Sequence, residues 1–268
     1  MITILVEGQA LSAFCPEFAS GAALVVGGTG GIGSAICRQL AEAGSHVAFT
    51  YRSNDKAADD VALTVESPGR ESLALSVDVE DPASIAAAVA AAIARFGHLH
   101  SIVYAAGPSI EFLYIHEIKS AEWARVINAD VNGCFNLIEA TLPHLRERRA
   151  GSYIAIITAA VDHAPPRDIL SAAPKAAIEM LVRGVAREEG RNGIRANCVG
   201  PGYIAAGLGL ATVHEQTRDF VDKMVRSIPL KRAGTADDIA NAVVFLLSDK
   251  ANYITGVSIP VAGGLQLV

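Results

Sequence analysis

The stretch V-G-G-T-G-G-I-G at residues 26–33 decides the fold class of this chain. A short apolar run at residues 22–26 leads into it, and a helix-like run at residues 34–43 follows it. A glycine-rich turn between a strand and a helix brings backbone N–H groups to a phosphate, with the positive end of the helix dipole behind it. Glycine is needed because a Cβ would hold the phosphate off the backbone and forbid positive φ angles. The stretch therefore predicts a turn that binds a nucleotide.

Strand-like and helix-like runs alternate along the rest of the chain, with no repeat, linker or charge block to mark a second domain. This alternation predicts an α/β fold: a single-domain, doubly wound parallel sheet of the Rossmann type, about seven strands with helices on both faces. We expect residues 1–20 to form an N-terminal extension and residues 21–268 to form the dinucleotide-binding domain. The expected strands are 22–27, 46–50, 72–77, 101–105, 152–157, 194–199 and 256–260, and the expected helices are 32–43, 55–66, 82–96, 121–148, 171–190, 214–226 and 235–248.

Composition excludes several classes of protein. A net charge of −6 without a Lys/Arg cluster argues against a nucleic-acid partner. No apolar run reaches the roughly 18 residues that span a bilayer, and no basic residue precedes the short apolar stretch near the N-terminus, which argues against a signal peptide. The four cysteines form no C-x-x-C pair, so neither a zinc site nor a disulfide framework is indicated. We therefore expect a cytoplasmic protein without a metal or a membrane partner.

The glycine turn and several later motifs resemble those of the short-chain dehydrogenase/reductase family, especially its ketoacyl-reductase-like branch. The resemblance runs from about residue 21 to residue 268. It implies an oxidoreductase that uses a nicotinamide cofactor and a small-molecule substrate, either a carbonyl/alcohol or an activated C=C bond. The resemblance rests on the motifs Gly27-x-x-x-Gly31-Ile-Gly33, Asp78-Val79, Ala105-Ala106-Gly107, Lys175 in its helix, Asn197-Cys-Val-Gly-Pro201-Gly202, and the late blocks at 229–235, 255–256 and 263–264.

Arg52 and Ser53 follow the second strand, where an acidic residue would bind the adenosine ribose and repel a 2′-phosphate. An arginine can instead pair with that phosphate and a serine can donate to it, so NADP(H) is favoured over NAD(H). The other cofactor contacts that the resemblance implies are Gly27, Thr29, Gly30, Gly31, Ile32 and Gly33 at the phosphates, Asp78 and Val79 at the adenine, Ala105, Ala106, Gly107 and Lys175 at the ribose, and Pro201, Gly202 and Ile204 at the nicotinamide.

The catalytic positions depart from the family pattern of Asn, Ser, Tyr and Lys. Lys175 matches, but Ser171 stands at the tyrosine position four residues earlier. The serine position corresponds to Thr158, which keeps a hydroxyl, and the asparagine position corresponds to Asp130. An aliphatic hydroxyl is a far weaker acid than a phenol, whose pKa is about 10. A simple carbonyl reductase built with this set is therefore expected to be slow.

A second branch of the family, the 2,4-dienoyl-CoA reductases, resembles this chain in its Ser-x-x-x-Lys motif and in the asparagine before Gly133, here Asn132. The acid tyrosine of that branch corresponds to Ala160, so the proton donor is missing from both family positions. Asp162 and His163 are candidates from the same loop. The alternative function is a nucleotide-binding member with no redox turnover, acting as a partner or sensor.

Two structural expectations concern the long helices. Pro174 is tolerated best in a first turn, which predicts that Ser171 opens its helix as the N-cap residue. The Ala- and Leu-rich faces of the helices at 121–148 and 171–190 exceed what one sheet face can cover. Together with the family resemblance, these faces predict a homo-oligomer, a tetramer.

Overall fold

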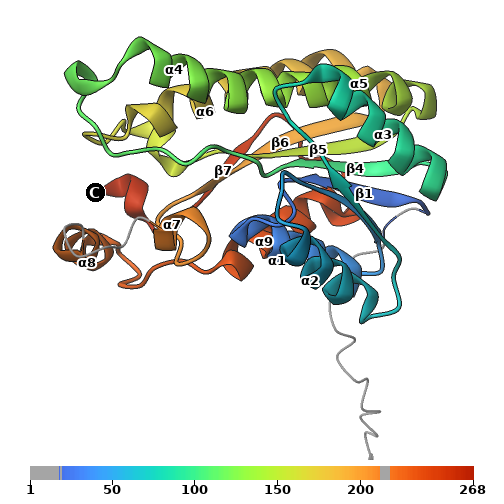
Figure 1. Cartoon of the computed structure of the whole chain (residues 1–268), viewed down its shortest axis with the longest axis horizontal. Coiled ribbons are helices and arrows are strands. Elements are labelled where there is room, and N and C mark those ends of the chain that lie inside the picture. The colour runs from blue at the N-terminus through green and yellow to red at the C-terminus, as the bar shows by residue number, and fades with distance from the viewer. Residues whose placement is uncertain (1–17, 19, 212–217) are drawn as a thin grey trace, which may run out of the picture.

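The computed structural model describes residue 18, residues 20–211 and residues 218–268. These residues form one parallel sheet with strand order β3-β2-β1-β4-β5-β6-β7 and helices on both faces (Figure 1), which confirms the predicted doubly wound fold. The strand order reverses between β1 and β4, and ligands of such sheets bind beyond the carboxyl ends of the strands at this point. The strands are β1 (Ala22–Val26), β2 (His46–Tyr51), β3 (Ser72–Ser76), β4 (Leu99–Tyr104), β5 (Gly151–Ile156), β6 (Ile194–Pro201) and β7 (Ser258–Val261).

Two helical layers cover the sheet. Figure 1 shows α3, α4, α5 and α6 over one face and α1, α2 and α9 over the other. Helices α7 and α8 lie between β6 and α9 in the chain. The helices are α1 (Gly31–Glu42), α2 (Asp55–Glu66), α3 (Pro82–Phe96), α4 (Ser120–Ile127), α5 (Gly133–Arg148), α6 (Ile169–Glu189), α7 (Leu208–Ala211), α8 (Arg218–Ser227) and α9 (Ala236–Leu247).

Each face of the sheet has its own apolar core. Strand β1 is buried at all five positions, as expected of a strand that is covered on both sides. Leu24 packs into the core under α3, α5 and α6, whereas Val25 packs into the core under α1 and α9. Three cysteines, Cys37, Cys134 and Cys198, are buried as free thiols in these two cores.

Local capping signals fix where several helices begin. The Asp81 side chain accepts from the Ala83 amide at 2.9 Å, and Pro82 occupies the first helical position of α3. The Asn54 side chain caps α2 at the Ala57 amide, at 3.0 Å. Thr235 and Asp238 form a capping box at α9. These ends could be predicted because each signal lies within four residues of the helix that it starts.

The helix expected at 121–148 is helical throughout, but it contains a π-helical segment that the sequence did not predict. The structure divides it into α4, a π-helical segment at Asn128–Asn132, and α5. Apolar periodicity does not reveal the π turn, because such a turn inserts one residue without changing the composition of the buried face. The inserted turn buries Asp130, and sites of this kind are frequently functional.

Several expectations concern residues outside the described ranges. Residues 1–17 and 19 of the expected N-terminal extension are among them, so the boundary near residue 20 stays a prediction. The first part of the helix expected at 214–226 is also outside, and α8 is described from Arg218 onward. Within the described residues, no helix is long and apolar enough to cross a membrane. In the same part of the chain, no group of three or more His, Cys, Asp or Glu side chains is placed to hold a metal ion.

Candidate active site

The glycine turn leads from the end of β1 directly into the N-terminus of α1. Gly30 is the N-cap residue of α1, and no side chain makes a capping hydrogen bond to the first amides of the helix. The Gly30 amide itself donates to the Gly27 carbonyl at 3.0 Å, which closes the turn. Amides in this arrangement fit the diphosphate of a dinucleotide, because they offer hydrogen bonds together with the positive end of the helix dipole.

Two of the glycines are required by close backbone contacts. Gly27 has φ +84°, and a Cβ there would lie 2.8 Å from the carbonyl oxygen of Ala105. A Cβ on Gly33 would overlap the carbonyl oxygen of Gly27. The turn is also held from β2, where the Thr50 side-chain oxygen accepts from the Gly27 amide at 3.1 Å. Residues 105–107, which follow β4, therefore lie directly beside the turn.

Arg52 and Ser53 lie just beyond the carboxyl end of β2, and both are exposed. Within the described residues, the Arg52 guanidinium has no hydrogen bond or ion pair, while its backbone carbonyl accepts from Ser76 at 3.1 Å. Its backbone is thus fixed and its cationic group is available. An available guanidinium at this position fits a 2′-phosphate.

Asp78 and Val79 follow β3. One carboxylate oxygen of Asp78 accepts from the Glu80 amide at 3.0 Å, which orders the turn before α3. The Val79 carbonyl accepts from Asn136 at 3.0 Å, and a Cβ on Gly133 would touch the Val79 side chain at 3.1 Å. The predicted adenine pair is therefore fixed against α5.

Asp130 and Lys175 form a buried ion pair between the π-helical segment and α6. The Lys175 Nζ donates to Asp130 Oδ1 at 2.8 Å, and the two side chains are only 12% and 4% exposed. A Cβ on Gly107 would lie 3.3 Å from that oxygen and 3.5 Å from that nitrogen. The pair therefore lies beside the residues that follow β4, which are predicted to pass under the ribose. The structure brings Asp130, Lys175 and Gly107 together.

Tyr104 holds the π-helical segment in place, a role that the sequence did not indicate. Its buried hydroxyl donates to the Ala129 carbonyl at 2.7 Å, one residue before Asp130. A Cβ on Gly133 would lie only 2.6 Å from the same hydroxyl oxygen. Burial raises the pKa of the Tyr104 phenol well above its usual value, so the hydroxyl stays a donor. The sequence offers two signals for this role, the tyrosine at the end of β4 and the glycine at the start of α5.

Thr158 and Asn132 have partners of their own. Thr158 precedes a 3₁₀ turn at Ala159–Asp162, and its side-chain oxygen accepts from the Ala160 amide at 3.2 Å. Asn132 is exposed and donates to the side chain of Asn128 at 2.9 Å. It therefore does not join the pair formed by Asp130 and Lys175, and its predicted catalytic role stays a prediction.

Ser171 is not the N-cap residue of its helix, so that prediction is wrong. Helix α6 begins at Ile169, and the N-cap position belongs to Asp168. The Ser171 amide donates to the Asp168 carbonyl at 3.0 Å, which places Ser171 in the first turn. Pro174 lies inside the helix, where its buried ring contributes apolar contacts that offset the missing amide donor. Lys175 consequently lies nearly two turns into α6.

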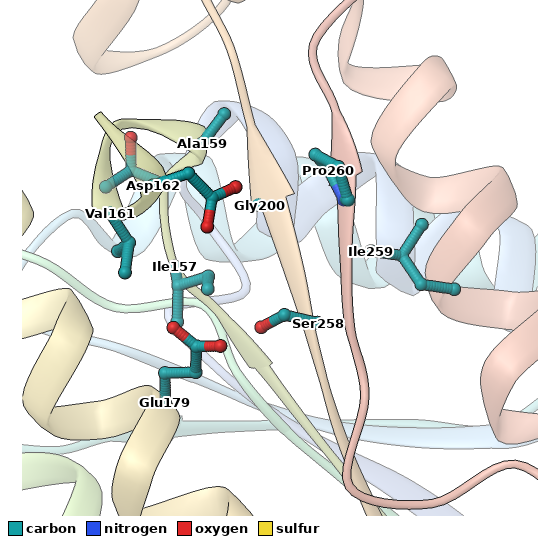
Figure 2. A pocket seen from close by; sticks show the side chains of 10 residues that line it. Ile157, Ala159, Val161, Asp162, Glu179, Gly200, Ser258, Ile259 and Pro260 are labelled. Carbon is teal, nitrogen blue, oxygen red and sulfur yellow. The ribbon is translucent and has the colours of Figure 1, made fainter. Parts of the chain in front are cut away.

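A small pocket lies beside Thr158, between the 3₁₀ turn, α6 and β7. Figure 2 shows the carboxylates of Asp162 and Glu179 directed into it from opposite sides, with the Ser258 hydroxyl facing Glu179. Glu179 is nearly buried and pairs with Arg183 on its own helix. Asp162 therefore lines this pocket, and both Asp162 and the other predicted loop candidate, His163, are exposed.

The end of β6 completes the site. Pro201 is the last residue of the strand, and the Gly202 amide donates to the Val261 carbonyl at 3.2 Å. Ile204 is buried and pairs with Gly234. The chain then returns to the glycine turn, because a Cβ on Gly31 would lie 2.5 Å from the Gly207 amide nitrogen. The glycine turn and the segment that follows β6 are therefore adjacent at this edge of the sheet.

Comparison with known proteins identifies relatives of this chain. Residues 26–266 match the family model described as enoyl-(acyl carrier protein) reductase. The chain is 35% identical over 245 residues to the 3-oxoacyl-[acyl-carrier-protein] reductase FabG of Staphylococcus aureus, covering 91% of this chain and 98% of that relative. It is 34% identical over 246 residues to the uncharacterized oxidoreductase YgfF of Escherichia coli, covering 90% and 98% of the two chains.

Solved structures agree with the sequence relatives. A short-chain dehydrogenase/reductase from Mycobacterium ulcerans superposes with a TM-score of 0.86 at 29% identity, covering 93% of this chain and 91% of the other. Levodione reductase superposes with a TM-score of 0.86 at 29% identity, covering 94% of this chain and 100% of the other. With the glycine turn, the sheet order and the lysine of α6 already in place, these matches show that the chain belongs to the short-chain dehydrogenase/reductase family of oxidoreductases.

Proposed function

We propose that this protein is an NADP(H)-dependent oxidoreductase acting on a carbonyl/alcohol or on an activated C=C bond. The observation that carries the proposal is the uncapped N-terminus of α1 beside an exposed Arg52 whose guanidinium has no partner within the described residues. The amides suit a diphosphate and the guanidinium suits a 2′-phosphate. A reduced nicotinamide bound there would supply the hydride.

The proposed cofactor site follows the carboxyl edge of the sheet from β3 to β6. Its backbone contributes the phosphate contacts, and its few side chains select the ribose and the adenine. Arg52 and Ser53 take the 2′-phosphate, and Lys175 takes the ribose hydroxyls. The remaining proposed contacts are Gly27, Thr29, Gly30, Gly31, Ile32, Gly33, Asp78, Val79, Ala105, Ala106, Gly107, Pro201, Gly202 and Ile204.

The proposed catalytic group is a substituted version of the family's catalytic tetrad. Thr158 and Ser171 offer hydroxyls that would orient the substrate oxygen, and Lys175 follows Ser171 by four residues in α6. Asp130 holds the Lys175 ammonium in place through the 2.8 Å ion pair. Asn132 is retained as a candidate that would have to turn inward from its bond to Asn128.

Arg52→Asp tests the cofactor preference. The variant is expected to bind NADPH at least about 10-fold more weakly, because it loses a charged hydrogen bond of about 1.5–3 kcal/mol, while NADH binding changes little. Arg187→Asp, at an exposed position of α6, is the matched control for charge reversal. Titration of both cofactors is the measurement, and an equal loss for NADPH and NADH would refute the preference.

A second candidate is a nucleotide-binding member without redox turnover. Two observations favour it: the Lys175 ammonium is already paired with Asp130, and position 171 carries no phenol. NADPH oxidation measured with a panel of activated ketones, 3-oxoacyl thioesters and enoyl thioesters separates the two functions. Tight NADPH binding without turnover of any of these substrates would select the second.

We also propose a cytoplasmic homotetramer with no nucleic-acid or membrane partner. The layer formed by α4, α5 and α6 exposes three large apolar side chains, with Trp123 at 39%, Phe135 at 50% and Met180 at 63% exposure. Exposed apolar groups gathered on one layer are typical of a subunit interface. Light scattering at micromolar concentration tests the assembly, and a monomer there would refute it.

A further inference from the structure

Asp168 stands at the N-cap position of α6 but does not cap the helix. An aspartate in that position normally accepts from an amide of the first turn through its side chain. Here the amides of Ser171 and Ala172 donate instead to the Asp168 backbone carbonyl, at 3.0 and 2.9 Å, and the side chain makes no capping bond. The carboxyl group is therefore not used by the helix that it begins.

As the N-cap residue of α6, Asp168 falls at a position that helical spacing puts on the same face as Lys175. Residues three and four apart in a helix are neighbours on its surface, so Asp168, Ser171 and Lys175 follow one another at i, i+3 and i+7. Lys175 lies against Asp130 and Gly107 at the carboxyl edge of the sheet. With a rise of about 1.5 Å per residue, Asp168 is about 4.5 Å along the axis from Ser171. Position 171 thus falls between positions 168 and 175 along this face of the helix.

The surroundings of Asp168 favour its neutral form. The residue is half-buried, and its carboxyl group has no hydrogen bond or ion pair within the described residues. Burial raises the pKa of the Asp168 carboxyl to about 6. Nearby cations are engaged elsewhere: the Arg167 guanidinium donates to the Phe112 carbonyl at 2.7 and 3.0 Å, and Lys175 pairs with Asp130. The other charged or titratable groups close in sequence, Asp162 and His163, are exposed.

We infer that Asp168 is the general acid of this site and takes the place of the missing tyrosine. The inference rests on the proposed oxidoreductase function. In the reduction of a carbonyl, the substrate carbon takes up a hydride from NADPH, and the C=O π electron pair moves to the oxygen. The O–H bond of Asp168 breaks, and its proton passes to that oxygen, directly or through the Ser171 hydroxyl. The resulting carboxylate regains a proton from water on its exposed side.

Asp168→Asn tests the inference, with Asp168→Glu as the conservative variant and Glu188→Gln, an exposed carboxyl group of the same helix, as the matched control. The turnover number of the wild type is expected to fall as the pH rises above about 6, because the acid loses its proton. Asp168→Asn should lose about 100-fold in turnover number, and with it this pH dependence. Asp168→Glu and Glu188→Gln should keep most of the rate. NADPH affinity should be unchanged in all of them.

A readout without cofactor complements the kinetics. Carbon-13 NMR of the free protein should show an aspartate carboxyl titrating near pH 6 that disappears in Asp168→Asn. Normal turnover and an unchanged pH profile in Asp168→Asn would overturn the inference and leave the proposed function standing. So would an Asp168 titration near the ordinary value of about 4. Tight NADPH binding with no turnover by the wild type would overturn the proposed function, and the role of Asp168 would fall with it.

Discussion

The two ends of the sheet differ in how their polar groups are used. At the carboxyl end, the first amides of α1 have no side-chain cap, and the carboxyl group of Asp168 caps nothing. At the amino end, the Leu99 amide donates to His144 at 3.2 Å, and the Glu71 amide donates to His46 at 3.0 Å. Hydrogen-bonding capacity is left open at one end for ligands and is used internally at the other. Matched substitutions at the two ends should therefore affect function at one and only stability at the other.

The largest contrast is expected between two ion pairs: Asp130–Lys175 at the carboxyl end of the sheet and Glu189–Arg146 at the amino end. Asp130→Ala leaves the 12% exposed Lys175 without its partner, which should lower the free energy of unfolding by about 3–5 kcal/mol. Glu189→Ala at the amino end frees Arg146, which is 51% exposed and regains water, so the cost should be about 1 kcal/mol. Urea unfolding measures both. Adding Lys175→Met to Asp130→Ala should restore stability, and equal costs for the two single variants would contradict the contrast.

Two glycines provide the second contrast. Cβ atoms at Gly33 and at Gly193 would each overlap a backbone carbonyl oxygen, that of Gly27 and that of Arg149 respectively. Both alanine variants should be destabilised by about 1–3 kcal/mol. Only Gly33→Ala should also weaken NADPH binding, by about 100-fold, because a displaced turn loses about 3 kcal/mol of charged hydrogen bonds. Calorimetric titration of the folded protein with NADPH measures the affinity of both variants. An equal loss of NADPH affinity in Gly33→Ala and Gly193→Ala would contradict the expected difference between the two ends of the sheet.

The third contrast is in the response to acid. Burial lowers the pKa of His100 to about 4, and its ring contacts the hydroxyls of Ser45 at 3.0 Å and Ser101 at 2.8 Å. Since the unfolded chain takes up this proton first, stability is fully present above about pH 6.5 and is lost as the pH falls toward 4, by about 3 kcal/mol. His100→Gln should remove this loss, with the exposed His116→Gln as control. An unchanged slope in His100→Gln would show that His100 is not responsible. Asp168, at the opposite end, has the opposite sign, because its raised pKa adds stability as the pH falls from about 6 toward 4.

The smallest contrast uses two buried tyrosines. Tyr104→Phe removes the bond to the Ala129 carbonyl, and Tyr153→Phe removes the bond to Thr141. Each should cost about 1 kcal/mol of stability. Tyr104→Phe should in addition weaken NADPH binding a few-fold, since the π-helical segment that carries Asp130 is no longer held. Equal affinities in the two variants would show that Tyr104 serves stability alone.

The sequence was most informative where function depends on the backbone. The spacing of glycines at residues 27, 31 and 33 between an apolar strand and a helix is a local pattern, and it located the turn, the sheet and the start of α1. The caps at Asp81 and Thr235 are equally local. Each of these features can be read within a few residues, because steric contact and capping act over that range.

The catalytic part of the candidate site could be predicted only in part from the sequence. Asp130 and Lys175 were identified by their motif positions, but the ion pair between them joins residues 45 apart in sequence. The π-helical segment and the position of Asp168 depend on how α4, α5 and α6 pack, which apolar periodicity does not report. Ser171 was misplaced because the rule for proline in a first turn was applied without the compensating burial of Pro174.

The three buried cysteines give the molecule built-in reporters of local opening. Burial raises the pKa of the Cys134 and Cys198 thiols to about 12 and raises that of Cys37 further, so the reactive thiolate is scarce while the structure is closed. Cys37 is in α1, Cys134 is in the first turn of α5 beside the π-helical segment, and Cys198 is in β6. In a Cys15→Ser background, alkylation at each site therefore measures how often that layer opens to solvent. Protection of Cys37 and Cys134 by NADPH would map the effect of the ligand on each half of the site separately.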